Sequence, residues 1–508
     1  MKTKLSFILQ LFFVFSYGQN IKINITTTEV ENTISKHIYG HFAEHLGRCV
    51  YGGIYVGDTN KTIPNTNGVR NDIIEALKEL QIPNLRWPGG CFADIYHWKD
   101  AIGPKENRKH IENVSWGGVR EDNSFGTHEF LNLCEALGAQ PYLAVNMNSG
   151  TVQEAVEWER YVNNNNGASN LTDLRKENGR DKPWNVKYWG IGNESWDCGG
   201  HMTAEYYVNL YKRYATAMTS YANDEKLYRI AVGPGTDDYQ WTETIMKNIP
   251  ARRIEGLSVH HYSVFNWEDK GSSYEFTNEE YLKTMQRAWF MEEFITKNSE
   301  IMDKYDPEKK VGLIVDEWGG WYNVMPNTNK SFLYQQNTMR DAMIAGLTLN
   351  IFNNHADRVH MANLAQTVNV LQAIILTNDE KMILTPTYHV MNMYKVHQDA
   401  LLLLSTIENN PIFGTIPAIS VSASEDKEKK KHVSVVNIDN TKSYKLSINI
   451  ENYKNFSASI LTSKKVQDHN TFDNPNNITP ENFKNYKINK NEITLTIPPF
   501  SLVVFSEN

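Results

Sequence analysis

Cysteine is scarce in this chain of 508 residues, which contains only 4 of them. None of the 4 is spaced as Cys-x-x-Cys, and so few cannot form a disulfide framework for so long a chain. One disulfide could still form in an oxidising compartment, and the sequence does not identify which two cysteines would form it. With 41% hydrophobic residues, the chain is instead expected to fold around a large apolar core.

Long hydrophobic runs are also lacking. The apolar run Leu5–Phe15 is well short of the roughly 20 residues that a transmembrane helix needs. It follows a Lys-bearing start and precedes the small residues Ser16 and Gly18, which is the layout of a secretory signal peptide. We therefore expect residues 1–18 to be a signal peptide, no membrane span, and a soluble protein that is secreted or periplasmic.

Basic clusters interleaved with aromatic residues are absent, and the formal net charge is -8. A protein that binds a phosphate backbone usually carries the opposite pattern, so no nucleic acid partner is expected. The mixed-charge run at residues 425–431 lies between two expected strands and is interpreted as a solvated hairpin loop.

The periodicity between residues 37 and 398 is that of β/α units, because short apolar runs alternate with segments of helical spacing. The expected strands are His37–Phe42, Asn84–Trp87, Pro141–Asn146, Val186–Ile191, Tyr228–Val232, Gly256–His260, Gly312–Asp316 and Val359–Leu364. The expected helices include Val69–Leu80, Thr127–Leu137, Thr151–Tyr161, Thr203–Tyr221 and Thr338–Asn350. Eight strands joined in this way predict an α/β fold, a (β/α)8 TIM barrel.

After a last helical stretch near Tyr388–His397 the periodicity changes to two. The expected strands are then His432–Ile438, Tyr444–Ile450, Ala458–Leu461, Ile493–Ile497 and Leu502–Phe505. This pattern predicts an accessory antiparallel β-sandwich domain over residues 399–508. The segment 19–36 also alternates near its start and is expected to add one strand to the sandwich, which leaves 37–398 as the catalytic barrel.

Two carboxylates directly follow apolar strands. The segment VKYWGIGNE ends in Asn193 and Glu194, and VGLIVDEWGG contains Asp316 and Glu317. Polar residues at the carboxyl ends of barrel strands line the active-site mouth of a TIM barrel. Hydrolysis of an acetal needs two such carboxyl groups, one that protonates the leaving oxygen and one that attacks or activates water. The sequence therefore predicts that Glu194 and Glu317 are catalytic.

A zinc site is the competing interpretation, since His41, Glu44 and His45 spell H-x-x-E-H. That motif binds a metal only on a helix, where residues four apart share one face. Here it follows Ile38-Tyr39-Gly40 and is expected to leave the first strand, where the two histidines would point apart. We therefore expect neither a metal nor any other cofactor.

At these residues the chain resembles glycoside hydrolase family 51, the α-L-arabinofuranosidases. The resemblance runs from about Ile34 to His397 and rests on several ordered motifs. They are YGHFAEHLG at 39–47, LRWPGGCFADIYHWKDAIGP at 85–104, NSFGTHEF at 123–130, NVKYWGIGNE at 185–194, LSVHHY at 257–262, VDEWGGWY at 315–322 and ANLAQTVNVLQ at 362–372. It implies the barrel and sandwich predicted above, and a retaining, exo-acting enzyme.

The resemblance also implies a role for each matching residue. Glu194 is expected to be the general acid/base and Glu317 the nucleophile. Groups expected to bind the sugar are Glu44, Cys91, Asn193, Tyr262 and Gln366, with Trp196 on the leaving-group side. Arg86 and His260 are expected to orient the carboxylates. Cys91 is expected to be a reduced thiol that faces the sugar.

The segment SWDCGG at 195–200 departs from the family pattern, which puts the natural polymer in doubt but not the donor sugar. The implied partners are arabinose-containing polysaccharides or oligosaccharides of the plant cell wall, such as arabinan or arabinoxylan, and the resemblance suggests a homo-oligomer. An endoglucanase of the same fold remains an alternative. A non-catalytic carbohydrate-binding protein is the other, which the presence of both Glu194 and Glu317 disfavours.

Overall fold

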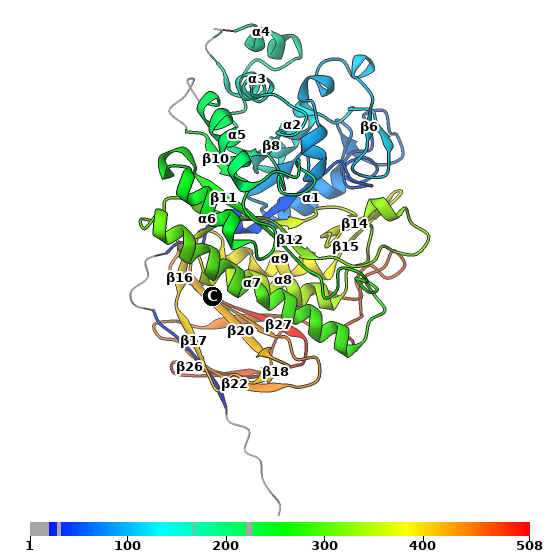
Figure 1. Cartoon of the computed structure of the whole chain (residues 1–508). Coiled ribbons are helices and arrows are strands. Elements are labelled where there is room, and N and C mark those ends of the chain that lie inside the picture. The colour runs from blue at the N-terminus through cyan, green and yellow to red at the C-terminus, as the bar shows by residue number, and fades with distance from the viewer. Residues whose placement is uncertain (1–19, 28–31, 166, 168, 220–225) are drawn as a thin grey trace, which may run out of the picture.

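The computed structural model describes residues 20–27, 32–165, 167, 169–219 and 226–508. The predicted signal peptide, residues 1–18, lies outside the described residues. Figure 1 shows a helix-rich part that contains the barrel and, below it, a strand-rich part formed mainly by the end of the chain. The predicted fold class, a (β/α)8 barrel with an accessory β-sandwich, is confirmed.

Eight parallel strands close into the barrel in the order β10, β11, β12, β13, β2, β5, β8 and β9. Their bounds in chain order are β2 (Gly40–Phe42), β5 (Asn84–Trp87), β8 (Gln140–Val145), β9 (Tyr188–Ile191), β10 (Tyr228–Ala231), β11 (Gly256–Ser263), β12 (Gly312–Gly320) and β13 (Val359–Ala365). The fourth strand, β9, and the seventh, β12, therefore lie on different sides of the barrel.

The helices of the described residues are α1 (Asn71–Leu80), α2 (Thr127–Leu137), α3 (Val152–Asn163), α4 (Asn170–Glu177), α5 (Ala204–Ala217), α6 (Tyr239–Asn248), α7 (Asn278–Tyr305), α8 (Met339–Asn354) and α9 (Pro386–Tyr394). Short 3-10 turns are η1 (Lys36–Tyr39), η2 (Cys91–Ile95), η3 (Trp98–Ala101), η4 (Lys105–Asn107), η5 (Ala251–Arg253), η6 (Lys330–Phe332) and η7 (Lys395–His397). Within the described part, no helix is long and apolar enough to cross a membrane.

Threonine marks where many of these helices begin. Its hydroxyl accepts a backbone N–H of the first turn at Thr151, Thr203, Thr277, Thr338 and Thr385. Each such cap satisfies a donor that the helix itself leaves free and contributes about 1 kcal/mol. These caps explain why the expected helix starts at Thr151, Thr203 and Thr338 fall next to the observed ones.

The strand-rich part consists of two facing sheets. One contains β17 (Ser405–Glu408), β1 (Ile21–Ile25), β22 (Tyr444–Asn449), β26 (Glu492–Ile497) and β25 (Tyr486–Asn489). The other contains β16 (Leu401–Leu403), β20 (Ile419–Glu425), β21 (Lys431–Asn437), β27 (Ser501–Glu507), β23 (Phe456–Leu461) and β24 (Glu481–Asn482). The N-terminal strand β1 pairs antiparallel with β17 but parallel with β22, so the first sheet is mixed.

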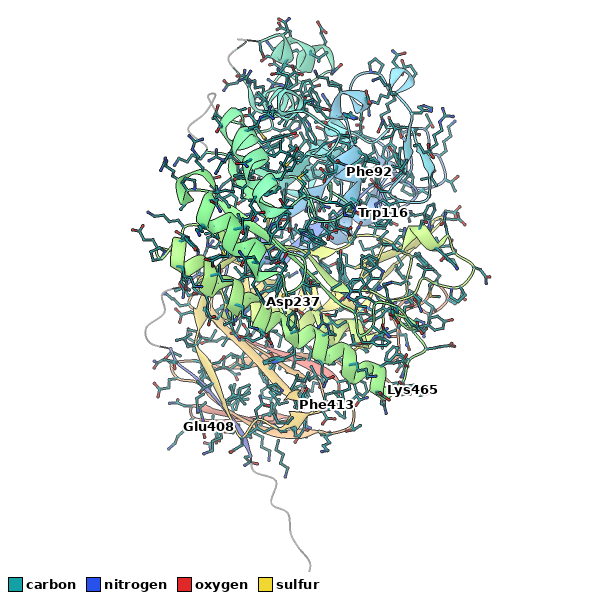
Figure 2. The ribbon with its side chains drawn as sticks, in the orientation of Figure 1. Phe92, Trp116, Asp237, Glu408, Phe413 and Lys465 are labelled. Atoms are coloured by element: carbon teal, nitrogen blue, oxygen red, sulfur yellow. A yellow bond between two sulfur atoms is a disulfide. The ribbon has the colours of Figure 1, made fainter. Side chains whose placement is uncertain are left out.

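Four small hairpins complete the described elements. They are β3 (Asn65–Thr66) with β4 (Val69–Arg70), β6 (Ile111–Asn113) with β7 (Val119–Glu121), β14 (Ile375–Asn378) with β15 (Lys381–Leu384), and β18 (Ile412–Phe413) with β19 (Ile416–Pro417). In Figure 2, Phe92 and Trp116 lie in the barrel part, whereas Glu408 and Phe413 lie in the strand-rich part.

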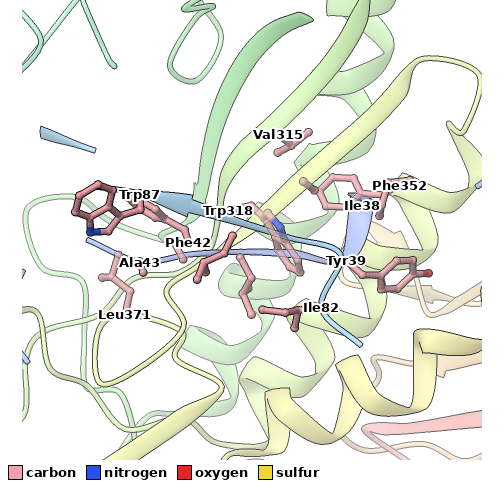
Figure 3. Packing of buried hydrophobic residues seen from close by; sticks show 14 of the residues in the cluster. Ile38, Tyr39, Phe42, Ala43, Ile82, Trp87, Val315, Trp318, Phe352 and Leu371 are labelled. Carbon is pink, nitrogen blue, oxygen red and sulfur yellow. The ribbon is translucent and has the colours of Figure 1, made fainter. Parts of the chain in front are cut away.

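Helix α8 joins the two parts. It is buried along nearly its whole length because the barrel covers one side and the sandwich the other. A β-carbon on Gly346 would lie 2.5 Å from Leu502, and Asn350 and Asn353 donate to serine hydroxyls of β20. On the barrel side, Trp318 packs edge-on against Phe352 (Figure 3). The interface is therefore part of the core rather than a loose contact between domains.

Candidate active site

The carboxyl ends of β9 and β12 bring the two predicted carboxylates together. Glu194 follows β9, and Glu317 lies within β12. One oxygen of each carboxylate and one nitrogen of His260 all lie within 4.8 Å of one another. Carboxyl groups about 5 to 5.5 Å apart permit direct attack by one of them, whereas an inverting enzyme needs a gap of about 6.5 to 9.5 Å for water. The geometry is that of a retaining glycosidase.

Glu317 is fixed by two donors. Arg86 on β5 donates through Nη1 to Oε1 at 2.8 Å, and the hydroxyl of Tyr262 on β11 donates to Oε2 at 2.7 Å. The same guanidinium donates to the side-chain oxygen of Asn193 at 2.6 Å and lies over the ring of Phe42. Charge-assisted bonds of this kind hold a carboxylate in one orientation. Glu317 is thus prepared to act as a nucleophile.

His260 links the two sides of the site. Its Nδ1 lies 2.8 Å from Oε1 of Glu194, and its Nε2 lies 3.0 Å from Oδ1 of Asp316. Burial alone would lower the pKa of His260, but the carboxylates of Glu317, Asp316 and Glu194 raise it to about 10. The imidazolium therefore donates to both neighbours. Burial would raise the pKa of Asp316, but Arg86 and His260 lower it, so that this carboxyl stays ionised.

Glu194 occupies a tight turn with an unusual backbone. Its φ is 36°, in the left-handed region that costs residues with a β-carbon about 1 to 2 kcal/mol. Its carbonyl accepts the backbone N–H groups of Asp197 and Gly199 at 2.7 and 3.1 Å. Burial raises the pKa of Glu194, although the hydrogen bond from His260 acts in the opposite direction. A raised pKa suits a group that must hold a proton before the reaction.

Asp94, which sequence reasoning did not single out, supports that turn from η2. Its Oδ1 accepts the backbone N–H groups of Met147 and Asn148 at 2.7 and 3.2 Å, and its Oδ2 accepts that of Asn193 at 3.2 Å. The residue is fully buried. Asp94 therefore ties the ends of β8 and β9 together beneath Glu194. Its place in the PGGCFAD segment was visible, but its contacts were not.

Glu44 forms the opposite wall. Its Oε1 accepts the backbone N–H of Phe92 and the indole N–H of Trp116 at 3.1 and 2.9 Å, and its Oε2 accepts Nε2 of Gln366 at 3.0 Å. Burial and the nearby charge of Glu317 raise the pKa of Glu44 to about 7, against the effect of these donors. Trp116 was not predicted, because it comes from the β6–β7 hairpin and not from a strand end.

Gly89 and Gly90 are required by close approach. A β-carbon on Gly89 would lie 2.6 Å from Cγ of Glu44, and one on Gly90 would lie 2.8 Å from Oε1 of Glu317. The backbone of the PGG motif thus passes directly against both carboxylate side chains. No larger residue fits there without displacing them.

The expectation for Cys91 is wrong. Cys91 forms a disulfide with Cys198, from which it is separated by 107 residues in sequence. The physical reason is that the turn after Glu194 folds back over η2 and brings the two Cα atoms to 5.5 Å, within the range a disulfide spans. Cys91 still lines the cavity, so that a disulfide sulfur takes the place of the predicted free thiol. Sulfur of Cys198 lies 3.6 Å from Oε2 of Glu194.

These groups surround a cavity of about 320 Å³. Of the predicted residues, those lining it are Glu44, Cys91, Glu194, Trp196, His260, Tyr262, Glu317 and Gln366. Asn193 and Arg86 are buried behind that surface. His260 was expected only to orient other groups, yet it reaches the cavity itself.

Aromatic rings form much of the wall and mouth. Trp321 packs edge-on against Tyr262 and Trp267 at ring distances of 5.1 and 5.6 Å, and Trp267 is 49% exposed. The indole N–H of Trp196 donates to the carbonyl of Gly233 at 3.1 Å. Trp318, in contrast, is buried outside the barrel, because neighbouring residues of a strand point to opposite faces.

The H-x-x-E-H residues do not converge on a metal. Both ring nitrogens of the buried His41 lack a partner among the described residues, and His45 accepts the indole N–H of Trp87 at 3.1 Å. Glu44 points into the sugar cavity instead. Paired carboxylates at the fourth and seventh strand ends, one fixed by an arginine and a tyrosine and one with a raised pKa, define a retaining glycoside hydrolase.

Comparison with known proteins gives the family. The chain matches the models "Alpha-L-arabinofuranosidase 1 domain" over residues 76–280 and "Alpha-L-arabinofuranosidase C-terminal domain" over residues 316–501. A curated relative from Bacteroides ovatus, the intracellular exo-alpha-L-arabinofuranosidase, is 48% identical over 499 residues, which are 96% of each protein.

Two solved structures agree. The GH51 arabinofuranosidase from Xanthomonas axonopodis pv. citri has a TM-score of 0.94 and 42% identity, over 96% of this chain and 100% of that one. The α-L-arabinofuranosidase from Thermotoga maritima, in an arabinose complex, has a TM-score of 0.85 and 32% identity, over 96% and 99%. The chain belongs to glycoside hydrolase family 51, the α-L-arabinofuranosidases.

One prediction is overturned by these findings. A secreted or periplasmic protein was expected from the N-terminal sequence, but the 48% identical relative is named an intracellular enzyme. A Lys-bearing start with a short apolar run is a pattern of low specificity, since it depends on composition alone. The prediction of secretion is therefore withdrawn.

Proposed function

We propose that the protein releases terminal, non-reducing α-L-arabinofuranosyl residues by a double displacement in which Glu317 is the nucleophile and Glu194 the acid/base. The observation that carries this proposal is the approach of the two carboxylates within 4.8 Å, with Arg86 and Tyr262 both bound to Glu317. Candidate substrates are arabinan, arabinoxylan and related oligosaccharides.

In the first step, a carboxylate oxygen of Glu317 bonds to the anomeric carbon while the glycosidic bond breaks. Glu194 transfers its proton to the departing oxygen, so the leaving group departs as a neutral alcohol. Arg86 keeps both Glu317 and Asn193 in place, because one guanidinium bonds to each. The side-chain N–H₂ of Asn193 donates one hydrogen toward the sulfur of Cys198 at 3.8 Å, and its second hydrogen is proposed to bind the 2-hydroxyl, a contact that strengthens as positive charge develops on the ring.

In the second step, Glu194 is ionised and removes a proton from water, whose oxygen attacks the anomeric carbon and releases Glu317. His260 supports both states of Glu194, since its Nδ1 lies 2.8 Å from Oε1. The imidazolium stabilises the carboxylate once the first proton has left. Two inversions at one carbon give overall retention.

The shape of the site indicates attack at chain ends. The cavity of about 320 Å³ is lined by Glu44, Gln366, Tyr262 and the bridged Cys91, together with both proposed catalytic carboxylates. A set of polar groups that surrounds one ring on several sides accepts a terminal sugar and excludes a continuing chain. The rest of the polymer is then expected to leave past Trp196 and Trp267.

Product analysis tests this exo mode. Linear arabinan and arabinoxylan are expected to yield arabinose alone from the earliest time points, because each binding event places one terminal ring in the cavity. Chromatography of early digests makes the measurement, with a β-glucan as the comparison substrate. Early longer oligosaccharides, or cleavage of the β-glucan, would favour the endoglucanase alternative.

The pH dependence provides a second test. Glu194 must be protonated in the first step, so kcat/KM falls as pH rises through its pKa. The hydrogen bond and charge of His260 lower that pKa, so His260→Asn is expected to move the alkaline limb of the profile to higher pH. His261→Asn is the matched control, because His261 bonds instead to the carbonyl of Arg287. A limb that stays in place or moves to lower pH in His260→Asn contradicts the assignment of Glu194.

A further inference from the structure

Three ligand-type side chains meet at one side of the cavity. Sulfur of Cys91, sulfur of Cys198 and a carboxylate oxygen of Glu194 all lie within 4.8 Å of one another. All three residues are partly exposed, and Cys91 and Glu194 line the cavity. The mechanism uses only the carboxylate. In the oxidised protein the two sulfurs bond to each other and cannot bind a metal.

Reduction changes what these atoms can do. A thiolate from the solvent attacks one sulfur of the bridge to give a mixed disulfide, and a second thiol releases it. Two small thiols are thereby oxidised to one disulfide. Cys91 and Cys198 together gain two electrons and two protons and become free thiols. Because the bridge borders the cavity, a small thiol reaches it without unfolding the barrel.

The positions then match those of zinc ligands. Tetrahedral zinc binds thiolate sulfur at about 2.3 Å and carboxylate oxygen at about 2.0 Å, which places those two atoms about 3.5 Å apart. The sulfur of Cys198 and Oε2 of Glu194 are already 3.6 Å apart. By the same geometry two sulfurs lie about 3.8 Å apart on zinc. With the Cα atoms at 5.5 Å, that separation requires rotation of the cysteine side chains rather than movement of a strand.

We propose that the reduced protein holds a zinc-type divalent cation on Cys91, Cys198 and Glu194, with water as the fourth ligand, and that this cation blocks the acid/base. Binding releases the two thiol protons, because thiolate is the ligand form. The carboxylate that bonds to the metal cannot deliver a proton to a leaving group. The inhibitory effect, though not the binding, rests on the proposed role of Glu194.

The test uses the full chain, oxidised or reduced with a phosphine that is then removed under argon, and Zn²⁺ as the probe. With Zn²⁺ added, the activity of the reduced protein on an aryl α-L-arabinofuranoside is expected to fall at least about tenfold, since proton transfer contributes about 10² to 10⁴-fold to the rate. A chelator should restore it. The oxidised protein should be unaffected by the same Zn²⁺ concentration.

Binding is read independently with Co²⁺, which gives a thiolate-to-metal charge-transfer absorption. One equivalent of Co²⁺ should produce this absorption in the reduced protein. The absorption should be weaker in C91S and in C198S, because each variant keeps only one of the two thiolates. C134S is the matched control, because Cys134 is a buried free cysteine in α2 and should leave both the absorption and the inhibition intact. If a serine variant does not fold, reduced wild type alkylated with iodoacetamide takes its place.

Equal inhibition of the oxidised protein, or inhibition that persists in C198S, would overturn the proposal. Either result would place the metal on Glu194, His260 and Glu317, which also lie within 4.8 Å of one another. The absence of the cobalt absorption in reduced wild type would overturn it as well. Cobalt absorption without loss of activity would leave the site standing and would instead count against Glu194 as the acid/base.

Discussion

Replacing Glu317 by alanine is expected to lower kcat by about 10⁵-fold on every substrate, whatever its leaving group. Without this carboxylate no glycosyl-enzyme can form. A substrate whose leaving group needs no proton should therefore react as slowly as the others. The measurement is hydrolysis of 2,4-dinitrophenyl and 4-nitrophenyl α-L-arabinofuranosides, compared with arabino-oligosaccharides. The loss should be similar for all three.

The control for this variant must address stability. Arg86 is buried and bonds to Oε1 of Glu317, so the alanine variant removes one of the two carboxylates that face this charge and is expected to be less stable, while Asp316 remains 3.5 Å from Nε of Arg86. Glu317→Gln keeps the shape and a hydrogen-bond acceptor and should be equally inactive while unfolding at a higher temperature than Glu317→Ala. Glu275→Ala, at an exposed position, should retain full activity.

Azide decides between the two roles. Added to Glu317→Ala, it can only attack the substrate directly and should give an arabinosyl azide of inverted configuration. If that variant instead regains activity with retained configuration, Glu317 is the acid/base and the assignments in this site must be exchanged.

Replacing Glu194 by alanine is expected to separate substrates by their leaving groups. Arabino-oligosaccharides need a proton on the departing oxygen, so kcat/KM should fall by about 10³-fold. The leaving group of the 2,4-dinitrophenyl glycoside departs as a stable anion and needs no proton, so kcat/KM for this substrate should change by less than about tenfold. Stopped-flow absorbance should then show a burst of dinitrophenol followed by slow turnover, because the glycosyl-enzyme accumulates when no base activates water.

Azide should accelerate the slow phase of Glu194→Ala and form an arabinosyl azide of retained configuration. Asp197→Ala is the matched control, since Asp197 lies three residues further along the same turn and should keep the wild-type dependence on leaving group. Equal losses on all substrates, without a burst or an azide effect, would contradict the assignment of Glu194.

The eight barrel strands were predictable because short apolar runs alternate with segments of helical spacing along the chain. The carboxyl ends of β11 and β12 were not predictable in this way. The apolar run of the seventh strand stops at Asp316, yet β12 continues to Gly320 because it pairs past a register shift with β11. Glu317 therefore lies within a strand, where its neighbours on both sides restrict its movement. Long-range pairing, which a local pattern does not contain, set that boundary.

Helix α7 was missed for a different reason. The 28 residues of α7 pack against α6, α8 and β11 at different points, so that no single apolar face continues along its length. Helix α8 was expected from the three-to-four spacing of its apolar residues, but its burial on nearly all sides follows from the sandwich that covers it. Both cases depend on which elements become neighbours in space.

In the structure, the proposed catalytic pair shares one site with Arg86, Tyr262, Gln366 and Glu44. The parts that sequence could not supply come from loops. Trp116 reaches Glu44 from a hairpin, and Asp94 bonds to backbone N–H groups just beyond the ends of β8 and β9. The pairing of Cys91 with Cys198 depends on a turn whose path is set by the left-handed conformation of Glu194. No spacing rule predicts such a turn.

The pairing of β1 with strands near the end of the chain delays the formation of the sandwich during synthesis. Asn24 on the first strand donates to Glu408, 384 residues later in the chain. A ribosome adds about 5 to 20 residues per second, so β1 emerges tens of seconds before its partners β17 and β22 exist. During that interval its apolar residues Ile21, Ile23 and Ile25 have no sheet to join. The barrel can begin to form first, whereas the sandwich closes only when synthesis is nearly complete.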